Sequence, residues 1–400
     1  MITDKIIISG TGCALADYLY SNISFQNPKF KKYLSKEAGD GGLEVGKLVF
    51  TEELEKFAGK SFQRIISEII GIREPDAFNI GGPSLVALIH ASQMLDRKHF
   101  NVKFFGIAGT DDTANKIFDI LRRLPLNIRN YSVTGHRVTP FTYVLSDSDY
   151  DDGQGERTFV NSIGAAWDYF PQQLTREFFH SHIVCFGGTA LVPRLHDNLA
   201  QLLQKAKCNK CITVVNTVFD FRNEKNNPGK PWPLVEDEES YALIDVLIMS
   251  CDEAIKISGK QTLNDAIGFF RLTQVSTFII TNGTNNLVAC SKGGLFKKTE
   301  LIKLPVSQKV IQDLKLNPAL RGDTTGCGDN FAGGVISAIA WQLKDRQKGD
   351  FDLVEALSWG IASGGFSCYT IGGMYLERSK DEKKVAVEQI QKEYLKQINL

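Results

Sequence analysis

The stretch DTTGCGDNFAGG, residues 323–334, places an Asp on either side of a glycine-rich turn. After this turn, apolar residues recur at helical spacing: Phe331, Val335, Ile339 and Leu343. This spacing predicts a helix that begins near Gly328 and Asp329. The first N–H groups of a helix have no partner within it, and glycines let an anion approach them without a Cβ in the way. The stretch therefore predicts an anion-binding loop with a carboxylate at its edge.

Other interpretations of this loop compete with the anion site. It could be a glycine hinge with no chemistry, and Asp329 could be a simple N-cap, because Asp is a preferred capping residue. Cys327 could be a nucleophile, but the sequence fixes no His near it. Two acids around more glycine than a cap requires favour phosphoryl transfer, in which a protein neutralises the moving phosphoryl group and orients the acceptor hydroxyl.

Composition and charge exclude several classes of protein. The 400 residues are 43% hydrophobic and 23% charged, which is typical of a globular chain. Lys plus Arg equals Asp plus Glu at 46 each, so we expect neither a nucleic-acid partner nor a membrane partner. No apolar run approaches the roughly 20 residues of a membrane helix, and no secretory leader is evident. With eight sparse, irregularly spaced cysteines, the sequence predicts a cytoplasmic protein with mostly reduced thiols.

Short apolar runs alternate with helix-length amphipathic segments along most of the chain. The expected strands are 5–9, 103–107, 183–187, 212–216, 245–249 and 277–281. The expected helices include 84–95, 113–124, 194–206 and 262–272. This alternation implies right-handed crossovers, hence a doubly wound α/β protein with a mostly parallel sheet and helices on both faces.

Two regions break this rhythm. Residues 39–51 and 137–161 alternate apolar and polar residues around Gly and Asp turns, which predicts antiparallel strands exposed to water on one face. We expect one domain over 1–400, with a small antiparallel β lid inserted discontinuously at 15–51 and 137–161.

Two cysteine and histidine patterns favour structural roles. Cys208 and Cys211 form a CxxC, but no second CxxC or HxxxH completes a zinc site. His180 and His182 approach an apolar strand and would share one face of it.

The segment SGTGCALADY, residues 9–18, begins like a dinucleotide-binding fingerprint with Gly10 and Gly12. The third glycine position is Leu15, and the fingerprint needs glycine there for close packing of helix and strand. A nicotinamide enzyme is therefore a weaker alternative to phosphoryl transfer.

The stretch 323–334 resembles the C-terminal signature of the ribokinase-like (PfkB) carbohydrate kinases. In this resemblance Asp329 is the catalytic base, and Gly326, Cys327 and Gly328 form the anion hole, with Cys327 as a small-residue variant. The resemblance extends over essentially the whole chain, with its motifs in the family's order.

The substrate side of the resemblance lies in the first half of the chain. Asp17 matches an early Asp that binds substrate hydroxyls, and Gly81 and Gly82 in NIGGPS match a substrate-side Gly-Gly. GERTF, 155–159, resembles a lid strand. Its Arg157 would pair either with a substrate carboxylate or phosphate or with nearby acids. Those acids are Asp149, Asp151 and Asp152.

The nucleotide side lies in the second half. IITNG resembles a TxG element, and the segment 360–373 resembles the one that closes over the base. Glu253 in SCDEA falls at the Glu of an Asn-x-x-Glu element associated with magnesium and phosphate. The candidate nucleotide-binding residues are Thr281, Gly283, Asp323, Thr325, Ser363 and Gly373.

The sequence departs from the family pattern at two positions. The Asn expected four residues beyond the Gly-Gly is Val86, and the Asn of Asn-x-x-Glu is Ser250. A polar substrate contact is therefore missing or supplied from elsewhere, and the metal network is thinner.

The resemblance implies an ATP-dependent, magnesium-dependent kinase that phosphorylates a hydroxyl of a sugar, sugar acid or polyol. A nucleoside kinase is the alternative within the family, and a non-catalytic ligand-binding or regulatory protein is the alternative of another class. The resemblance also leaves room for a monovalent cation such as K⁺ and for a homodimer formed through the lid.

Overall fold

The computed structural model describes residues 5–37, 39–153, 155–345 and 351–399. Its main sheet has nine strands: β1 Ile6–Gly12, β5 Phe100–Ala108, β6 Asn127–Val133, β9 Ile183–Gly187, β10 Ile212–Asn216, β11 Val246–Ser250, β12 Thr277–Thr281, β13 Leu287–Ser291 and β14 Ile302–Leu304. They lie in the order β14-β13-β12-β11-β10-β9-β1-β5-β6. Pairing is parallel from β6 to β12 and antiparallel at β13 and β14. The predicted mostly parallel sheet is confirmed.

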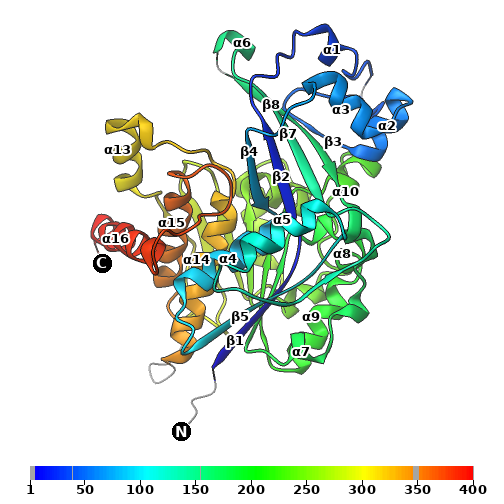
Figure 1. Cartoon of the computed structure of the whole chain (residues 1–400). Coiled ribbons are helices and arrows are strands. Elements are labelled where there is room, and N and C mark those ends of the chain that lie inside the picture. Colours follow the sequence, from blue (N-terminus) through cyan, green and yellow to red (C-terminus); the bar gives the residue numbers. More distant parts are fainter. Residues whose placement is uncertain (1–4, 38, 154, 346–350, 400) are drawn as a thin grey trace.

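Helices cover both faces of this sheet (Figure 1). Consecutive strand residues enter different apolar cores, as Phe104 and Phe105 do, and likewise Val214 and Val215. One core contains α4 Pro83–Met94, α5 Asp112–Leu121, α14 Cys327–Lys344 and α15 Leu353–Ser367. The other contains α9 Leu199–Cys208, α11 Cys251–Ser258 and α12 Leu263–Leu272. A sheet buried on both faces explains why its strands read as continuous apolar runs.

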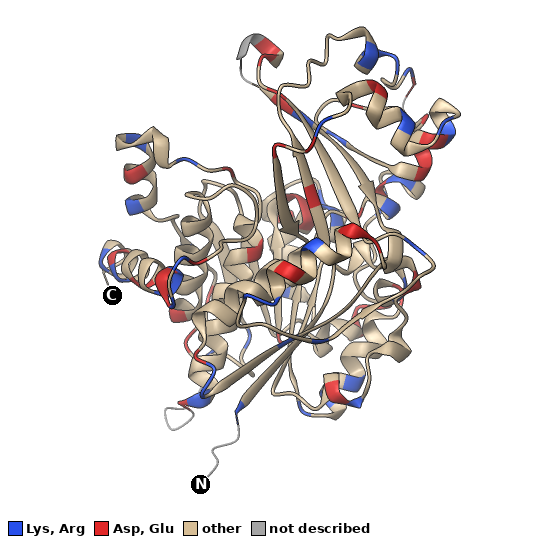
Figure 2. Ribbon diagram, in the orientation of Figure 1, with Lys and Arg blue, Asp and Glu red and all other residues tan. Residues whose placement is uncertain are grey.

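The remaining helices are short or peripheral. They are α1 Pro28–Lys31, α2 Thr51–Ala58, α3 Phe62–Ile70, α6 Tyr150–Gly153, α7 Arg176–Phe179, α8 Pro193–His196, α10 Phe221–Asn226, α13 Gln308–Leu316 and α16 Glu382–Gln397. The single helix expected over 194–206 is divided into α8 and α9. No helix in the described ranges is long and apolar enough to span a membrane. Lys and Arg are interspersed with Asp and Glu over the helices (Figure 2).

A second, smaller sheet projects from the main sheet (Figure 1). Its strands are β2 Leu15–Tyr20, β3 Leu48–Phe50, β4 Ala77–Gly81, β7 Phe141–Asp147 and β8 Glu156–Ser162, in the order β3-β8-β7-β2-β4. The expected antiparallel pairing holds for β2 with β4 and for β7 with β8, but β2 with β7 and β3 with β8 are parallel. The sheet is mixed because β2 and β7 both run outward from the main sheet, whereas β4 and β8 return to it. We call it the lid sheet.

The glycines of the dinucleotide-like segment lie within a strand. β1 continues through Gly10 and Gly12, and β2 begins at Leu15 with no helix between them. A Cβ on Gly12 would lie 1.8 Å from the carbonyl oxygen of Gly187 on β9. These glycines allow close packing of strands, so the structure does not support the nicotinamide alternative.

Candidate active site

The glycine-rich turn forms the start of α14. Gly326 is the N-cap with φ +75°, a backbone conformation that favours glycine, and a Cβ there would lie 2.4 Å from Cα of Gly373. A Cβ on Gly328 would meet nothing within 4 Å. The N-terminus of α14 is therefore open at Gly328 and tightly packed at Gly326. The N–H of Cys327 is engaged by Thr324 O at 3.3 Å, which leaves Gly326 and Gly328 as the better anion donors of the predicted three.

A segment that is distant in the sequence holds this turn in place. We call residues 322–328, which contain the turn, the cradle loop, and residues 368–373 the support segment. The N–H of Gly322 donates to Cys368 O and that of Asp323 to Thr370 O, each at 2.9 Å. The Asp323 carboxylate accepts from the N–H groups of Thr325 at 3.0 Å and Gly372 at 3.1 Å. Asp323 therefore ties the two segments together.

Asn330 is a supporting residue that the sequence analysis missed. Its amide donates to the carbonyls of Gly326 at 2.9 Å and Gly373 at 2.8 Å. Its side-chain oxygen lies 3.0 Å from His90 Nδ1 and accepts from Lys383 Nζ at 3.1 Å. Lys383 lies on α16 and is 1% exposed, and burial lowers its pKa to about 7. A buried polar network thus fixes the cradle loop from behind.

Two carboxylates near the cradle loop interact electrostatically. Asp329 lies in the first turn of α14, and enclosure by the protein, followed by the negative charge of Glu253, raises its pKa to about 7. Asp17 lies on β2 of the lid sheet. Burial raises the pKa of Asp17 to about 7, the charge of Asp329 adds to this, and a hydrogen bond with Thr142 opposes it. The structure thus brings together two acids that are 312 positions apart (329 minus 17).

The predicted Gly81 and Gly82 shape the Asp17 side of the site. A Cβ on Gly81 would lie 2.2 Å from Asp17 Oδ2, so this glycine leaves room for the carboxylate. Gly82 has φ +95° and caps α4, and a Cβ there would lie 2.6 Å from Cys13 O. Val86, which replaces an expected Asn, is buried and packs 3.1 Å from the Cβ position of Gly373.

Glu253 sits at the N-terminus of α11. Its Oε2 accepts from the N–H of Ser250 at 2.9 Å and from the hydroxyl of Thr217 at 2.6 Å, while Ser250 Oγ accepts from the N–H of Glu253. Ser250, which replaces the expected Asn, therefore completes a capping box. Glu253 Oε1 has no protein partner within the described residues. One free carboxylate oxygen near Asp329 fits a magnesium ion held largely through water, as is usual for Mg²⁺.

The candidate nucleotide-binding residues are divided between the surface and the interior. Thr281 ends β12, and Gly283 follows it with φ +55° and open space around its Cβ position. Ser363 requires a correction, because it is 0% exposed and faces Gly334 between α14 and α15. Gly373 is also buried, against Gly326, so it supports the cradle loop instead of facing a ligand. A side chain packed between two helices is not available to a nucleotide.

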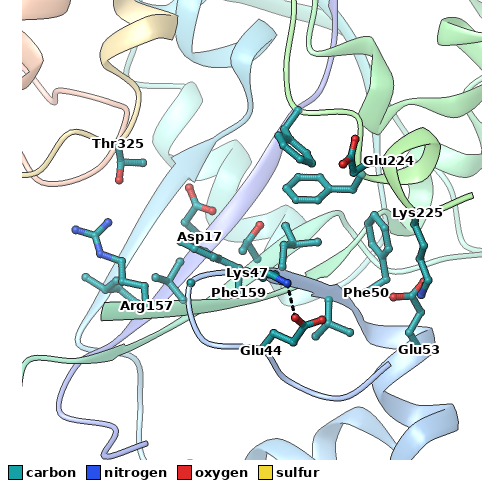
Figure 3. Close-up of a pocket in the computed structure, with 18 of the residues that line it drawn as sticks. Asp17, Glu44, Lys47, Phe50, Glu53, Arg157, Phe159, Glu224, Lys225 and Thr325 are labelled. Carbon is teal, nitrogen blue, oxygen red and sulfur yellow. Dashed lines mark hydrogen bonds and ion pairs between the residues drawn. The ribbon is translucent and has the colours of Figure 1, made fainter. Parts of the chain in front are cut away.

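A cavity of about 1180 Å³ opens between the lid sheet and the cradle loop. Arg157 and Thr325 lie at the Asp17 side, and Phe50 lies at the opposite side with Lys225 (Figure 3). Among the lining cations, Lys47 pairs with Glu44 at 2.5 Å and Lys225 pairs with Glu53. Arg157 forms no ion pair with a carboxylate whose side chain the structure describes, so its guanidinium is free for a ligand; the side chain of Asp152 lies outside those described.

The other cysteine and histidine patterns have structural roles. Cys211 is buried, and its thiol donates to the carbonyls of Phe179 and Ser181, each at 3.1 Å. His182 Nδ1 accepts from the N–H of Ile7 at 3.0 Å. No group of three His, Cys, Asp or Glu in the described ranges is arranged to hold a metal. For Cys327, a hydrogen bond with Cys368 and burial raise the thiol pKa, which opposes a role as the catalytic nucleophile that attacks the substrate.

Comparison with known proteins identifies the family. The model of the pfkB family carbohydrate kinases matches residues 78–377, which is 300 of the 400 residues. The chain belongs to this family. It is therefore a kinase, a phosphotransferase, as predicted from the cradle loop. Asp17 precedes the matched segment, so its role depends on the geometry described above.

Solved structures share the fold of this kinase. Adenosine kinase from Schistosoma mansoni in complex with 2-fluoroadenosine has a TM-score of 0.68 at 17% identity, covering 93% of this chain and 97% of that chain. A probable sugar kinase from Rhizobium etli CFN 42 has a TM-score of 0.67 at 14% identity, covering 96% and 98%. Ribokinase from Thermotoga maritima has a TM-score of 0.61 at 16% identity, covering 97% and 99%. These similarities confirm a ribokinase-like fold and leave the substrate between sugar and nucleoside.

Proposed function

We propose that this kinase transfers the terminal phosphoryl group of ATP to a hydroxyl on the sugar portion of a small molecule. The observation that carries the proposal is the position of Asp329, in the first turn of α14 beside the open Gly328 and close enough to Asp17 for its charge to raise the pKa of that residue. An acceptor hydroxyl between them would have a carboxylate on one side and an anion site on the other. Phosphoryl transfer needs both.

The three acids and the two glycines of the site would have separate roles in this reaction. Asp329 would orient the acceptor hydroxyl and take its proton, and a pKa of about 7 makes it a stronger base than an ordinary Asp. The N–H groups of Gly326 and Gly328 would hold the transferring group. Mg²⁺ would supply charge neutralisation on the phosphates, and Glu253 is the residue suited to hold it through water. Asp17 would bind substrate hydroxyls.

The cavity favours a substrate whose sugar carries an aromatic group, such as a nucleoside, over a free sugar. Five phenylalanines line it: Phe50, Phe78, Phe159, Phe219 and Phe221. The ring centroid of Phe221 lies 4.5 Å from that of Phe219 and 6.3 Å from that of Phe50. Aromatic rings offer apolar faces on which a base can stack. The carboxylate of Asp17 lies in the same cavity, so a polar sugar and an aromatic base would each meet a matching surface. The free guanidinium of Arg157 suits a phosphate or a substrate carboxylate.

The proposed activity can be tested by ADP release with magnesium ATP. The panel contains nucleosides, aldoses, ketoses, sugar acids and polyols, each assayed in K⁺ and in Na⁺. We expect turnover with nucleosides to exceed turnover with the matching free sugars. If no compound is phosphorylated while ATP still binds, the result supports a ligand-binding protein on the same fold.

Phe159→Ala is expected to raise KM for an aromatic substrate about 5- to 150-fold and to change kcat little. Loss of a stacking contact worth about 1–3 kcal/mol gives this range. The control is Phe170→Ala, which removes a 44% exposed ring outside the cavity. If KM for the nucleoside is the same in Phe159→Ala as in the unaltered kinase, the base does not stack on this ring.

A further inference from the structure

Two thiols are in contact where the cradle loop meets the support segment. Cys327 is the first residue of α14 and Cys368 follows the last residue of α15. Their sulfur atoms are 3.5 Å apart. Both residues are partly exposed, whereas Cys13 and Cys185 are buried. No other two cysteines in the described part of the chain form a sulfur contact.

The two thiols differ in reactivity. Thiolates, and not thiols, attack disulfides. The hydrogen bond between the two sulfur atoms lowers the pKa of Cys368 to about 7 and raises the pKa of Cys327. Cys368 is therefore suited to attack first, with Cys327 beside it to complete the exchange.

We propose that Cys327 and Cys368 are a modification site at which a low-molecular-weight disulfide reversibly oxidises the kinase. The Cys368 thiolate attacks one sulfur of the small disulfide, forms a mixed disulfide and releases one thiolate. Cys327 then loses its proton and attacks Sγ of Cys368, which forms the Cys327–Cys368 bond and releases the second thiolate. The protein loses two hydrogens, and the small disulfide is reduced to two thiols.

This oxidation would distort the cradle loop. The sulfur atoms must approach from 3.5 Å to about 2.05 Å. α15 is already close to Cys327, because a Cβ on Gly364 would lie 3.0 Å from Cys327 O. The turn that contains Gly326 and Gly328 would therefore have to shift, and these two residues hold the transferring group in the proposed reaction. A displacement near 1 Å in a catalytic arrangement lowers the rate about a hundredfold.

The test exposes the full chain to oxidised glutathione and then to dithiothreitol. We expect a peptide map with a Cys327–Cys368 cross-link, a fall in turnover of at least tenfold, and recovery of both on reduction. Cys368→Ser and Cys327→Ala should each abolish the cross-link and the oxidant-dependent fall relative to the same variant when reduced. The control is Cys208→Ser, which removes an exposed cysteine far from the cradle loop and should keep both responses.

The peptide map does not depend on the proposed substrate, so the two proposals fail separately. Absence of turnover in the reduced kinase counts against the proposed function alone. A stable glutathione adduct on Cys368 without the cross-link would contradict formation of the disulfide. A complete cross-link that leaves both turnover and calorimetric ATP affinity unchanged would contradict its effect on the kinase.

Discussion

Asp329→Asn is expected to lower kcat by about a hundredfold or more and to make the folded kinase more stable above pH 7. The loss of rate follows from removing a group that orients the acceptor hydroxyl and takes its proton, since acid-base catalysis contributes about 10²- to 10⁴-fold. The gain in stability follows from the environment of the same carboxylate. Two further carboxylates, Asp17 and Glu253, lie close enough to influence its ionisation or to be influenced by it.

The sign of the stability effect comes from the two pKa values. The folded pKa of Asp329 is about 7, whereas an unfolded Asp has a pKa of about 3.9. Between these values the folded state binds more protons than the unfolded state, so stability falls as pH rises from about 4 to 7 and stays low above pH 7. Asparagine carries no charge and escapes this loss. We expect Asp329→Asn to exceed the unaltered kinase by about 1 kcal/mol or more at pH 8 and to match it near pH 4.

Urea unfolding at pH 4.5 and pH 8, together with steady-state kinetics, measures both effects. The control is Asp119→Asn, at a carboxylate on α5 that is 63% exposed and pairs with Arg122. Exposed ion pairs contribute about 0–1 kcal/mol, so this variant should keep its kcat and its pH dependence of stability. Full activity in Asp329→Asn would exclude Asp329 as the base.

The parts of the site that follow from local sequence could be predicted. Glycine spacing and the apolar period after Gly328 fixed the start of α14 to within about a residue. The alternation of apolar runs and helical segments predicted β1, β5, β9, β10, β11 and β12 of the main sheet, because each of these buried strands carries its signal within five to nine residues. Whether a side chain in such a pattern is buried can therefore be inferred from its neighbours in the sequence. The alternation missed the three strands at the two edges of the sheet, β6, β13 and β14.

The parts that depend on distant contacts could not be predicted. Lys383 lies in a charged stretch of α16 and resembles a solvated surface lysine, yet it is buried and bonded to Asn330, 53 positions away. Ser363 sits in a glycine-rich segment that reads as a ligand loop but forms part of helix α15. The contribution of β4 to the lid sheet follows from its pairing with β2, whose paired residues lie 58 to 66 positions earlier in the chain. In each case the role of the residue or strand depends on contacts with distant parts of the chain and not on its local sequence.

Gly328→Ala is expected to lower kcat about a hundredfold without lowering stability. Gly326 cannot separate these effects, because its positive φ and its contact with Gly373 would make any side chain strain the fold. Gly328 has an ordinary helical backbone and no atom within 4 Å of its Cβ position. Alanine should therefore fit the protein and favour the helix by about 0.5–1 kcal/mol. The added methyl group would occupy the space that we assign to the transferring phosphoryl group.

The matched control is Gly268→Ala in α12, where a Cβ also meets nothing within 4 Å and no residue lines the cavity. Both variants should unfold at the same or a higher urea concentration than the unaltered kinase, and only Gly328→Ala should lose activity. Since loss of one donor to a developing anion costs about 10²- to 10³-fold, a fall smaller than about threefold would mean that the phosphoryl group does not approach α14 at this residue. A fall in kcat of the expected size at unchanged stability would place the chemistry at the N-terminus of α14. Both variants add one methyl group to open space on a helix, and only the one in α14 lies beside the proposed anion site.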